Sequence, residues 1–428
     1  MTTTRPHIIY DTVVIGAGAA GLIAAERAAS RELKTLLLER NRKPGVKILM
    51  SGGTRCNITQ ATDRRGIVTA YGPPGRFLYS ALAALGPQEL VDLIEGEGVL
   101  TKIEETGKIF PVSNKAADVL MAFLNRLHRS GCELALDESL VDLQPTADIA
   151  ADNGCFHLTT SKRSLFASRV IVTTGGQSYP GSGTTGDGYR WAAAMGHSIV
   201  PPRPALVPVT TSAPWVRELS GVTIPDVEIH LLEPNSNPSD QKSHLLDTRR
   251  GSLLFTHFGL SGPVILDISR HVSGHPRPQS LQLQCDFLPD LKPVDLDAQL
   301  RQQAAGEGKK QILSLVSELL PRRLAELLLN DAGLPSDKKA GELSNTNRTA
   351  LVRALKQFPI PVTGTRGFAK AEVTAGGVLL DEIDSSTMQS KLVPGLYFAG
   401  EVLDLDGPIG GYNFQAAFST GWLAGMSV

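Results

Sequence analysis

The amino-acid sequence predicts an α/β protein: a Rossmann-like dinucleotide-binding domain interrupted by a β-barrel-like and a helical subdomain. Three features of the chain lead to this prediction. The N-terminal region has the order strand, glycine turn, helix, strand and acid. The C-terminal region combines a buried strand, clustered glycines and an alanine-bearing helix. Between them, short β-rich runs give way to an apolar pattern of helical period.

The N-terminal region contains the strongest motif of the chain. A β-branched run, Thr12–Ile15, leads directly into the sequence GAGAAG at residues 16–21. A helical stretch follows from about Leu22 to Ser30, and a second apolar run, Thr35–Leu38, ends at Glu39. Strand, glycine turn, helix, strand and terminal acid in this register are typical of a dinucleotide-binding unit.

Each glycine of this turn has a physical role. Gly16 permits the tight turn, Gly18 lets the backbone approach a pyrophosphate, and Gly21 allows the helix and the strand to pack closely. The N-terminus of the helix offers unpaired N–H groups to phosphate. The Glu39 carboxylate can accept hydrogen bonds from both hydroxyls of an adenosine ribose. The sequence therefore predicts a dinucleotide site at this turn.

A second formal glycine motif, at residues 181–186, does not predict a second dinucleotide fold. Pro180 precedes it, and no strand with a terminal acid follows at the required distance. We interpret this segment as a loop that folds over the first cofactor. With one dinucleotide site in the chain, a nicotinamide donor would have to visit the substrate face transiently, or the electrons would have to come from elsewhere.

The middle of the chain predicts two inserted subdomains. Residues 201–291 contain short β-rich runs separated by Pro, Asn, Ser and Gly, which indicates a small barrel or sandwich. Residues 292–360 are helical in pattern, with an apolar face that continues through Pro321. Between residues 295 and 356, ten basic residues face eight acidic ones, so we interpret the basic pairs there as solvated helix faces.

The C-terminal region returns to the dinucleotide-binding domain. A buried strand ends at Gly400-Glu401, and the pair Gly410-Gly411 precedes a helix from about Phe414 to Ala424. This glycine–helix junction would again offer N–H groups to a ligand. We expect the strand to rejoin the N-terminal sheet, so that the middle of the chain is an insertion. Residues 1–200 and 361–428 would then form one domain.

The composition narrows the classes of function. The formal net charge is −1, so the chain has no large field of the kind that coats nucleic acid or an anionic membrane. The four cysteines are far apart in sequence, which predicts neither a metal site nor a disulfide framework. Because no targeting segment and no membrane-length apolar run is found, we expect a soluble, cytoplasmic protein without a membrane partner.

Six stretches that run from end to end of the chain carry a family resemblance. They are DTVVIGAGAAGL, KILMSGGTRCNIT, TTGGQSYPGSGTTGDGY, LLFTHFGLSGPVIL, KAEVTAGGV and LVPGLYFAGEVLDLDGPIGGYNFQAAFSTG. Together they resemble the BaiN/YhiN-like family of two-dinucleotide-binding-domain flavoproteins, which includes aminoacetone-oxidase-type proteins. Thr54 stands where the pattern has Gly or Ser. The resemblance implies a Rossmann-like FAD-binding domain, FAD as the cofactor, and a redox activity.

The resemblance also implies where the cofactor contacts lie. The glycine turn would hold the pyrophosphate, Glu39 the ribose, and Gly400-Glu401 the ribityl chain. N–H groups at residues 411–413 would face the pyrimidine edge of the flavin, where the reduced ring carries negative charge. The predicted cofactor-binding residues are Gly16, Gly18, Ala19, Ala20, Gly21, Glu39, Arg40, Lys47, Ser51, Gly52, Arg55, Cys56, Asn57, Val141, Thr174, Gly175, Gly176, Gly400, Glu401, Gly410, Gly411, Tyr412, Asn413 and Ala416.

Two side chains are candidates for catalysis beside the flavin. His257 lies in the block THFG, which the resemblance places near the flavin, and could act as acid or base. Cys56 could be a reactive thiol, although a buried inert cysteine explains it as well. Tyr179, Asp404 and Asp406 are further candidates, with aromatic packing and turn capping as their ordinary explanations.

Three functions remain open at this point. The first is an FAD-dependent oxidoreductase that transfers hydride between flavin and a small organic substrate, by reducing a conjugated double bond or oxidising a small amine. The second is a flavin-dependent reductase of a uracil base in RNA, for which the insert offers few excess cations. The third is a flavin-bound scaffold without activity, or a protein that has lost its cofactor, and the intact glycines argue against both. NAD(P)H could be the transient electron donor.

Overall fold

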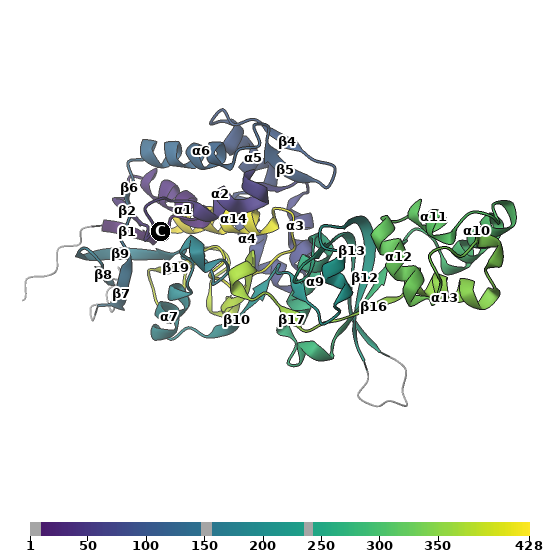
Figure 1. Cartoon of the computed structure of the whole chain (residues 1–428). Helices are drawn as coiled ribbons and strands as arrows, with labels where there is room; N and C mark the ends of the chain where they lie inside the picture. The colour runs from purple at the N-terminus through teal and green to yellow at the C-terminus, as the bar shows by residue number, and fades with distance from the viewer. Residues whose placement is uncertain (1–9, 147–155, 235–242) are drawn as a thin grey trace, which may run out of the picture. The chain divides into compact units, whose positions relative to one another are not determined.

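The computed structural model describes residues 10–146, 156–234 and 243–428 (Figure 1). The chain divides into two compact units. The first unit comprises Met1–Arg203 and Glu372–Val428, and the second unit is Pro204–Ala371. The Rossmann-type α/β fold predicted from the sequence is confirmed in the first unit. The exact domain boundaries, and a separation of the insert into two subdomains, stay predictions.

The parallel core of the first unit begins at the glycine motif. Strand β1 (Tyr10–Ile15) pairs in parallel with β2 (Thr35–Leu38) on one side and with β9 (Ser164–Val172) on the other. β6 (Glu133–Ala135) extends the sheet beyond β2. β19 (Leu396–Phe398) pairs in parallel with β9, so the C-terminal strand rejoins the N-terminal sheet as expected.

Three helices pack around this sheet. α1 (Ala19–Ala29) follows the glycine turn and packs against α14 (Tyr412–Ser427), close enough that a Cβ at Gly421 would lie 2.3 Å from Ala20 O. α6 (Ala116–Arg129) also packs against α1, with Val119 and Phe123 among its buried residues. This contact packs α14, which ends the chain, against α1, the helix that follows the glycine turn (Figure 1).

The remaining elements of the first unit complete its surface. β8 (Phe156–Thr160) pairs antiparallel with β9 and with β7 (Leu140–Pro145), which gives the sheet an antiparallel edge. The other strands are β3 (Thr59–Gln60), β4 (Thr101–Ile103), β5 (Lys108–Pro111), β10 (Ile199–Ala205) and β18 (Val373–Val378), and the other helices are α2 (Val46–Thr54), α3 (Arg64–Tyr71), α4 (Tyr79–Ala84), α5 (Pro87–Glu95) and α7 (Asp187–Ala194).

The second unit contains a seven-stranded sheet in the order β16-β15-β12-β13-β14-β11-β17. Its neighbouring strands pair antiparallel. The sheet packs on α9 (Pro263–Gly274), whose Val264, Ile265 and Ile268 are buried. The strands are β11 (Val209–Thr210), β12 (Thr223–Glu233), β13 (His244–Thr256), β14 (Gly259–Ser261), β15 (Gln282–Asp286), β16 (Phe358–Pro361) and β17 (Gly364–Thr365), with the short helix α8 (Trp215–Glu218).

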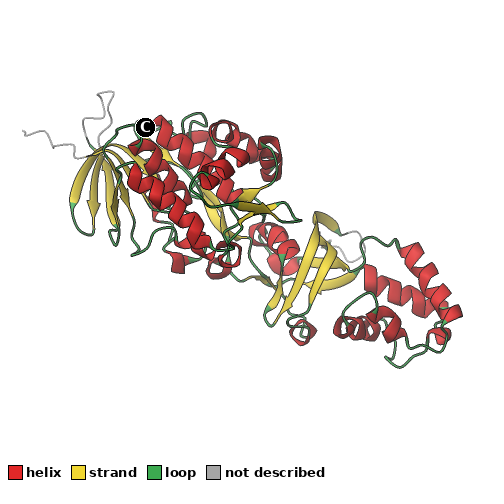
Figure 2. Cartoon of the chain, turned by 90° about the horizontal axis from the view of Figure 1, so that it is seen from above, coloured by secondary structure: helices red, strands yellow, loops and turns green. Residues whose placement is uncertain are grey.

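The helical part of the second unit lies in the sequence between β15 and β16, and Figure 2 shows it as a group of red helices. Its helices are α10 (Pro293–Gly306), α11 (Ile312–Ser317), α12 (Arg322–Asp331) and α13 (Asn345–Lys356). The expectation of one apolar face running through Pro321 is wrong, because the helix is broken there: α11 ends at Ser317, and Pro321 caps the start of α12 with a φ of −53° and a ψ of 135°. A proline cannot continue the hydrogen-bond ladder of the preceding helix.

Candidate dinucleotide-binding site

The glycine turn has the geometry of an anion site at a helix start. Gly18 is the N-cap of α1, and no described side chain caps the helix there. A Cβ at Gly18 would meet no described atom within 4 Å, so the space in front of the turn is open. A Cβ at Gly21, by contrast, would lie 1.8 Å from Gly16 O. The uncapped N–H groups of α1 therefore face a space that a pyrophosphate could fill.

Glu39 is fixed at the end of β2 by two backbone donors. Ala17 N donates to Glu39 Oε2 at 2.8 Å, and Asn41 N donates to Oε1 at 2.8 Å. The side chain is buried, and desolvation raises its pKa above the ordinary value. A carboxylate oxygen can accept more than one hydrogen bond. The geometry thus leaves acceptor capacity for ribose hydroxyls while tying Glu39 to the glycine turn.

The second glycine motif, residues 181–186, lies beside Arg40 and Asn41, the two residues that follow Glu39. Arg40 donates to Thr185 Oγ1 at 2.8 Å and forms an ion pair with Asp187 at 2.9 Å. Asn41 Nδ2 donates to Ser182 O at 3.0 Å. The segment is a loop with one 3-10 turn, Pro180–Ser182, as the interpretation of a covering loop requires. Arg40 is therefore placed to hold this loop rather than to be a free cation.

Four residues of the segment 51–57 have left-handed backbone geometry. Helix α2 loses its helical geometry at Ser51, and Gly52 and Gly53 have φ values of 54° and 67°. Thr54 and Cys56 continue with φ values of 70° and 61°. Glycine adopts this conformation at little cost, whereas a β-branched residue is strained in it. Thr54, where the family pattern has Gly or Ser, is therefore a position of backbone strain.

Arg55 and Cys56, which follow Thr54, have different surroundings. Arg55 is paired with Glu104 at 2.7 Å and stacks over the Phe110 ring at 4.0 Å, so its charge is already neutralised. Cys56 is fully buried, and desolvation raises its pKa to about 12. Such a thiol stays protonated near neutrality, which argues against a thiolate nucleophile. Its part in binding the cofactor stays a prediction.

Asn57 links this segment to the C-terminal glycines. With its amide oriented to satisfy both groups, Asn57 Oδ1 accepts from Gly411 N at 2.9 Å and Nδ2 donates to Thr59 O at 3.1 Å. The Gly411 N–H is thus engaged by protein, although the sequence predicted that it faces the flavin. α14 begins at the next residue, Tyr412, and no described side chain caps it. The predicted electrostatic role then rests on the N–H groups at the start of α14.

A polar cluster of Lys47, Ser178, Thr374 and Glu401 joins four separate segments, and we call it the Lys47–Glu401 cluster. Lys47 Nζ donates to Glu401 Oε2 at 2.5 Å and to Ser178 Oγ at 2.7 Å. Glu401 Oε1 accepts from Ser178 Oγ at 2.7 Å and from Thr374 N at 2.9 Å. Thr374 Oγ1 in turn accepts from Ser178 N at 2.9 Å. Ser178 and Thr374 were missed from the sequence, which carries no local signal for a contact of this sequence separation.

Tyr71 is a second residue that the sequence did not single out. Its hydroxyl donates to Tyr412 O at 3.0 Å, and a Cβ at Gly407 would lie 2.7 Å from its ring. Burial, together with the charges of Asp406 and Glu401, raises the pKa of Tyr71 well above its ordinary value. Asn413 holds the same loop by accepting from Gly407 N at 2.8 Å. Tyr71 and Asn413 therefore fix the loop in front of α14.

The other predicted cofactor residues of the first unit fall into two groups. Gly175 has a φ of 72°, a backbone geometry that favours glycine. A Cβ at Gly176 would lie 2.3 Å from Thr374 Oγ1, and a Cβ at Gly400 would lie 2.8 Å from Ala20 Cβ. Gly176 and Gly400 therefore lie where two segments approach closely. Ala416 is buried in α14. Val141, by contrast, is 53% exposed on β7, at the opposite end of the strand order from β2. Its side chain gives no structural support to a cofactor role.

Thr174 Oγ1 is a polar atom without a visible partner. It is buried and makes no hydrogen bond to any described residue. A Cβ at Gly188 would lie 2.2 Å from it, so α7 starts against this hydroxyl. A buried polar atom without a partner is costly unless a ligand or water satisfies it. Because Thr174 follows β9 beside the glycine turn, this atom fits a site that a bound cofactor completes.

His257 lies on the second unit, in the turn between β13 and β14. Its ring is exposed and meets the Phe258 ring edge-on, with the ring centroids 4.9 Å apart. The structure leaves the ring accessible to a ligand. Its role as acid or base stays a prediction.

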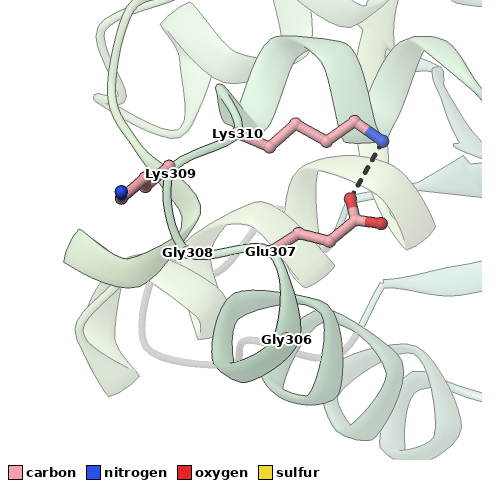
Figure 3. Close-up of a pocket in the computed structure, with 5 residues that line it drawn as sticks. All are labelled: Gly306, Glu307, Gly308, Lys309 and Lys310. Atoms are coloured by element: carbon pink, nitrogen blue, oxygen red, sulfur yellow. Dashed lines mark ion pairs between the residues drawn. The ribbon is translucent and has the colours of Figure 1, made fainter.

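A shallow pocket in the helical part of the second unit is lined by Gly306–Lys310 (Figure 3). Lys310 pairs with Glu307 at 3.0 Å and with Glu318 at 2.6 Å, while Lys309 points away from this pair. Arg322 likewise pairs with Glu326 at 3.0 Å. These ion pairs agree with the interpretation of the basic doublets as solvated helix faces.

Across 10–146, 156–234 and 243–428, no group of three or more His, Cys, Asp or Glu side chains could hold a metal ion. Within the same residues, no helix is long and apolar enough to cross a membrane.

Comparison with known proteins identifies the family. The model of the HI0933-like protein Rossmann domain matches residues 10–427. The chain belongs to this family. The BaiN/YhiN-like resemblance is thereby confirmed, and the protein is an FAD-dependent oxidoreductase. The open space at Gly18, the partnerless Thr174 hydroxyl and the uncapped helix starts fit FAD as the group that this domain holds.

Three curated relatives match nearly the whole chain. The chain is 33% identical over 416 residues to a ribosomal RNA dihydrouridine synthase of Escherichia coli K12, with 96% of each chain covered. It is 31% identical over 420 residues to the protein of the same name in Haemophilus influenzae, with 98% of each covered. It is 30% identical over 421 residues to a 3-dehydro-bile acid delta(4,6)-reductase of Clostridium scindens, with 97% of this chain and 98% of the relative covered.

One solved structure shows the same fold across the chain. The 3-ketosteroid delta1-dehydrogenase of Sterolibacterium denitrificans aligns with a TM-score of 0.50 at 15% identity, over 97% of this chain and 98% of that one. At this identity the likeness concerns the fold alone.

Proposed function

We propose that this protein uses reduced FAD to saturate a ring double bond conjugated to a carbonyl, with uracil in ribosomal RNA as its substrate. One observation carries the proposal. The relatives that share 33% and 31% of their residues with this chain are named as synthases of dihydrouridine, which is uridine with one ring double bond reduced. The bile-acid reductase name likewise describes double bonds conjugated to a 3-oxo group. The shared chemistry supports the reductive direction over amine oxidation.

The first unit has the parts that such chemistry needs. When bound, FAD would supply the hydride. The start of α1 would hold the pyrophosphate, and Glu39 would bind the ribose. Lys47 would place a positive charge beside Glu401 where the ribityl chain is expected, and the start of α14 would place N–H dipoles at the pyrimidine edge. Fixed dipoles of this kind stabilise negative charge without reorganisation.

Two further components of the reaction belong to the same proposal. Reduction of the double bond consumes one hydride and one proton, and His257 is our candidate for the proton donor because its imidazole ring is exposed. NAD(P)H would restore the reduced flavin by a transient visit, since the sequence contains one dinucleotide motif with its full context.

The proposal is tested with the holoenzyme, NAD(P)H and unmodified ribosomal RNA transcribed in vitro. We expect dihydrouridine to appear in nuclease digests analysed by mass spectrometry, and none to form without the nicotinamide. A 3-oxo steroid with conjugated ring double bonds serves as the comparison substrate. Reduction of the steroid with no dihydrouridine in the RNA would overturn the RNA proposal and favour a small-molecule reductase.

A further inference from the structure

Three side chains of the second unit, His257, Phe258 and Arg366, form a stacked group, and we call it the Arg366 stack. The Arg366 guanidinium lies over the Phe258 ring, with its central carbon 4.3 Å from the ring centroid. Phe258 meets His257 edge-on, with centroids 4.9 Å apart and an angle of 80° between the rings. His257 is exposed, and Phe258 and Arg366 are partly buried. The group thus combines a cation, an aromatic face and an imidazole at an accessible surface.

The backbone holds these residues in place. Thr256 Oγ1 donates to Gly259 O at 2.8 Å and closes the turn that carries His257 and Phe258. Gly259 has a φ of 147°, and a Cβ on it would lie 2.2 Å from Val209 O. The turn therefore packs so closely on β11 that only glycine fits at this position.

Arg366 reaches the same place from the other side of β11. Val209 pairs with Leu260 of β14 and with Thr365 of β17, so one short strand lies between the two partners of the stack. Arg366 N donates to Pro208 O at 3.0 Å, immediately before that strand. Three adjacent strands of one sheet thus fix the guanidinium over the ring.

Arg366 differs from two of the other arginines that stack on aromatic rings, because those two are paired with carboxylates. Arg27 lies over Trp422 at 4.3 Å and Arg55 over Phe110 at 4.0 Å, and each of these arginines also pairs with a glutamate. Arg366 has no ion pair with any residue that the structure describes. A guanidinium has five N–H donors in its plane, and stacking on Phe258 uses its face rather than those donors. Its in-plane donors therefore remain available to an acceptor from outside the protein.

We propose that the Arg366 stack is a site on the second unit that binds an unstacked uracil base of single-stranded RNA, with Arg366 donating to O4 and the His257–Phe258 pair covering part of the ring. This inference rests on the proposed function and names O4 of uracil as the acceptor. Cytosine presents an amino donor at the position of O4, so an arginine donor there would distinguish uracil from cytosine. Stacking on aromatic and Arg planes is also the usual way in which proteins hold an unstacked RNA base.

The test is binding of short single-stranded RNA to the oxidised holoenzyme, followed by fluorescence anisotropy at constant salt. A uridine oligonucleotide is compared with a cytidine oligonucleotide, because cytosine presents an amino donor where uracil presents O4. The native protein should prefer uridine by about tenfold. Arg366→Met should lose that preference, and Arg366→Lys should keep only part of it, because lysine retains the charge and lacks the planar fork.

The controls separate this inference from the proposed function. Arg322→Met removes an exposed arginine paired with Glu326 on α12 and should leave the preference for uridine intact. Flavin content and the melting temperature check that each variant folds. Unchanged uridine preference in Arg366→Met, or no preference in the native protein, would overturn the inference. If Arg366→Met loses the preference while no dihydrouridine forms with native enzyme, the binding site stands and the proposed reaction fails.

Discussion

Lys47 Nζ lies 2.5 Å from Glu401 Oε2, although the two residues are separated by most of the chain. The contact joins α2 to the segment after β19, and both side chains are largely buried, with 28% and 18% of their surfaces exposed. Ser178 bonds to both partners. This cluster connects segments of the first unit that the sequence assigns to different parts of the cofactor.

Removing the lysine tests whether this cluster supports FAD. Lys47→Met would leave the Glu401 carboxylate without its cation, at a cost of about 1–3 kcal/mol for a buried group that loses a partner. We expect a lower melting temperature and an FAD dissociation constant raised about tenfold or more, measured by flavin fluorescence. The matched control is Glu326→Gln, which breaks an exposed pair on α12 worth about 0.3–0.5 kcal/mol. Equal FAD affinity in Lys47→Met and native protein would refute the assignment.

Gly18 offers a way to separate folding from cofactor binding. A Cβ at this position meets no described atom within 4 Å, so Gly18→Val should leave the melting temperature of the apoprotein nearly unchanged. The same side chain would occupy the space of the pyrophosphate, and we expect the purified variant to be colourless and unable to take up FAD. Gly21→Val is the contrasting variant, because its Cβ would lie 1.8 Å from Gly16 O and should unfold the turn. A yellow Gly18→Val protein would contradict the location of the site.

The buried carboxyl of Glu39 predicts a pH dependence. Desolvation raises its pKa above the ordinary 4.5, so the carboxylate is protonated at a higher pH than a free side chain. A protonated carboxyl accepts fewer hydrogen bonds, and FAD affinity should therefore fall as the pH is lowered from neutrality toward 4.5. The stability of the apoprotein should change in the opposite sense, since a raised pKa means that stability is lost as the pH rises through it. Titration of FAD at several pH values, with Glu39→Gln as a weak and pH-insensitive reference, measures this.

Cys56 should be unreactive in the folded protein. With burial raising its pKa to about 12, about one thiol in ten thousand is ionised at pH 8. We expect iodoacetamide to leave Cys56 unmodified at pH 8 while alkylating it readily in urea, as read by peptide mass spectrometry. Rapid alkylation of the native holoenzyme at Cys56, with parallel loss of activity, would restore the thiol as a catalytic candidate.

Thr54 predicts a stabilising substitution. A β-branched residue with a φ of 70° costs of order 1–3 kcal/mol, and glycine removes that strain. Thr54→Gly should therefore raise the melting temperature by a few degrees. Thr106→Gly, at an exposed position outside the left-handed region, should lower it or leave it unchanged, because there glycine only adds freedom to the unfolded chain. A lower melting temperature in Thr54→Gly would show that the strain is absent.

The parts of the site that could be predicted from sequence are those written in consecutive residues. Gly16, Gly18, Gly21 and Glu39 lie within one strand–helix–strand unit, where each residue type has a fixed geometric reason. The return of the C-terminal strand to β9 was also predictable, because glycine-rich strand ends at both termini suggested one sheet.

What the sequence did not contain are contacts between distant segments. Ser178 and Thr374 look like ordinary loop and strand residues, and only the fold brings them to Glu401. The apolar face around Pro321 was misjudged because a 3.6-residue period can be continued by two separate helices that pack on one core. Engagement of the Gly411 N–H by Asn57 likewise depends on a pairing that no local pattern encodes.

The central claim is that FAD in this protein carries electrons from a nicotinamide to uracil in RNA. The most direct measurement is the visible spectrum of the purified protein under anaerobic conditions, recorded after adding NADPH or NADH and again after adding unmodified ribosomal RNA. We predict a bound flavin spectrum that bleaches with a nicotinamide and returns when the RNA is added. A flavin that stays oxidised with both nicotinamides, or a reduced flavin that the RNA does not reoxidise, would contradict the account.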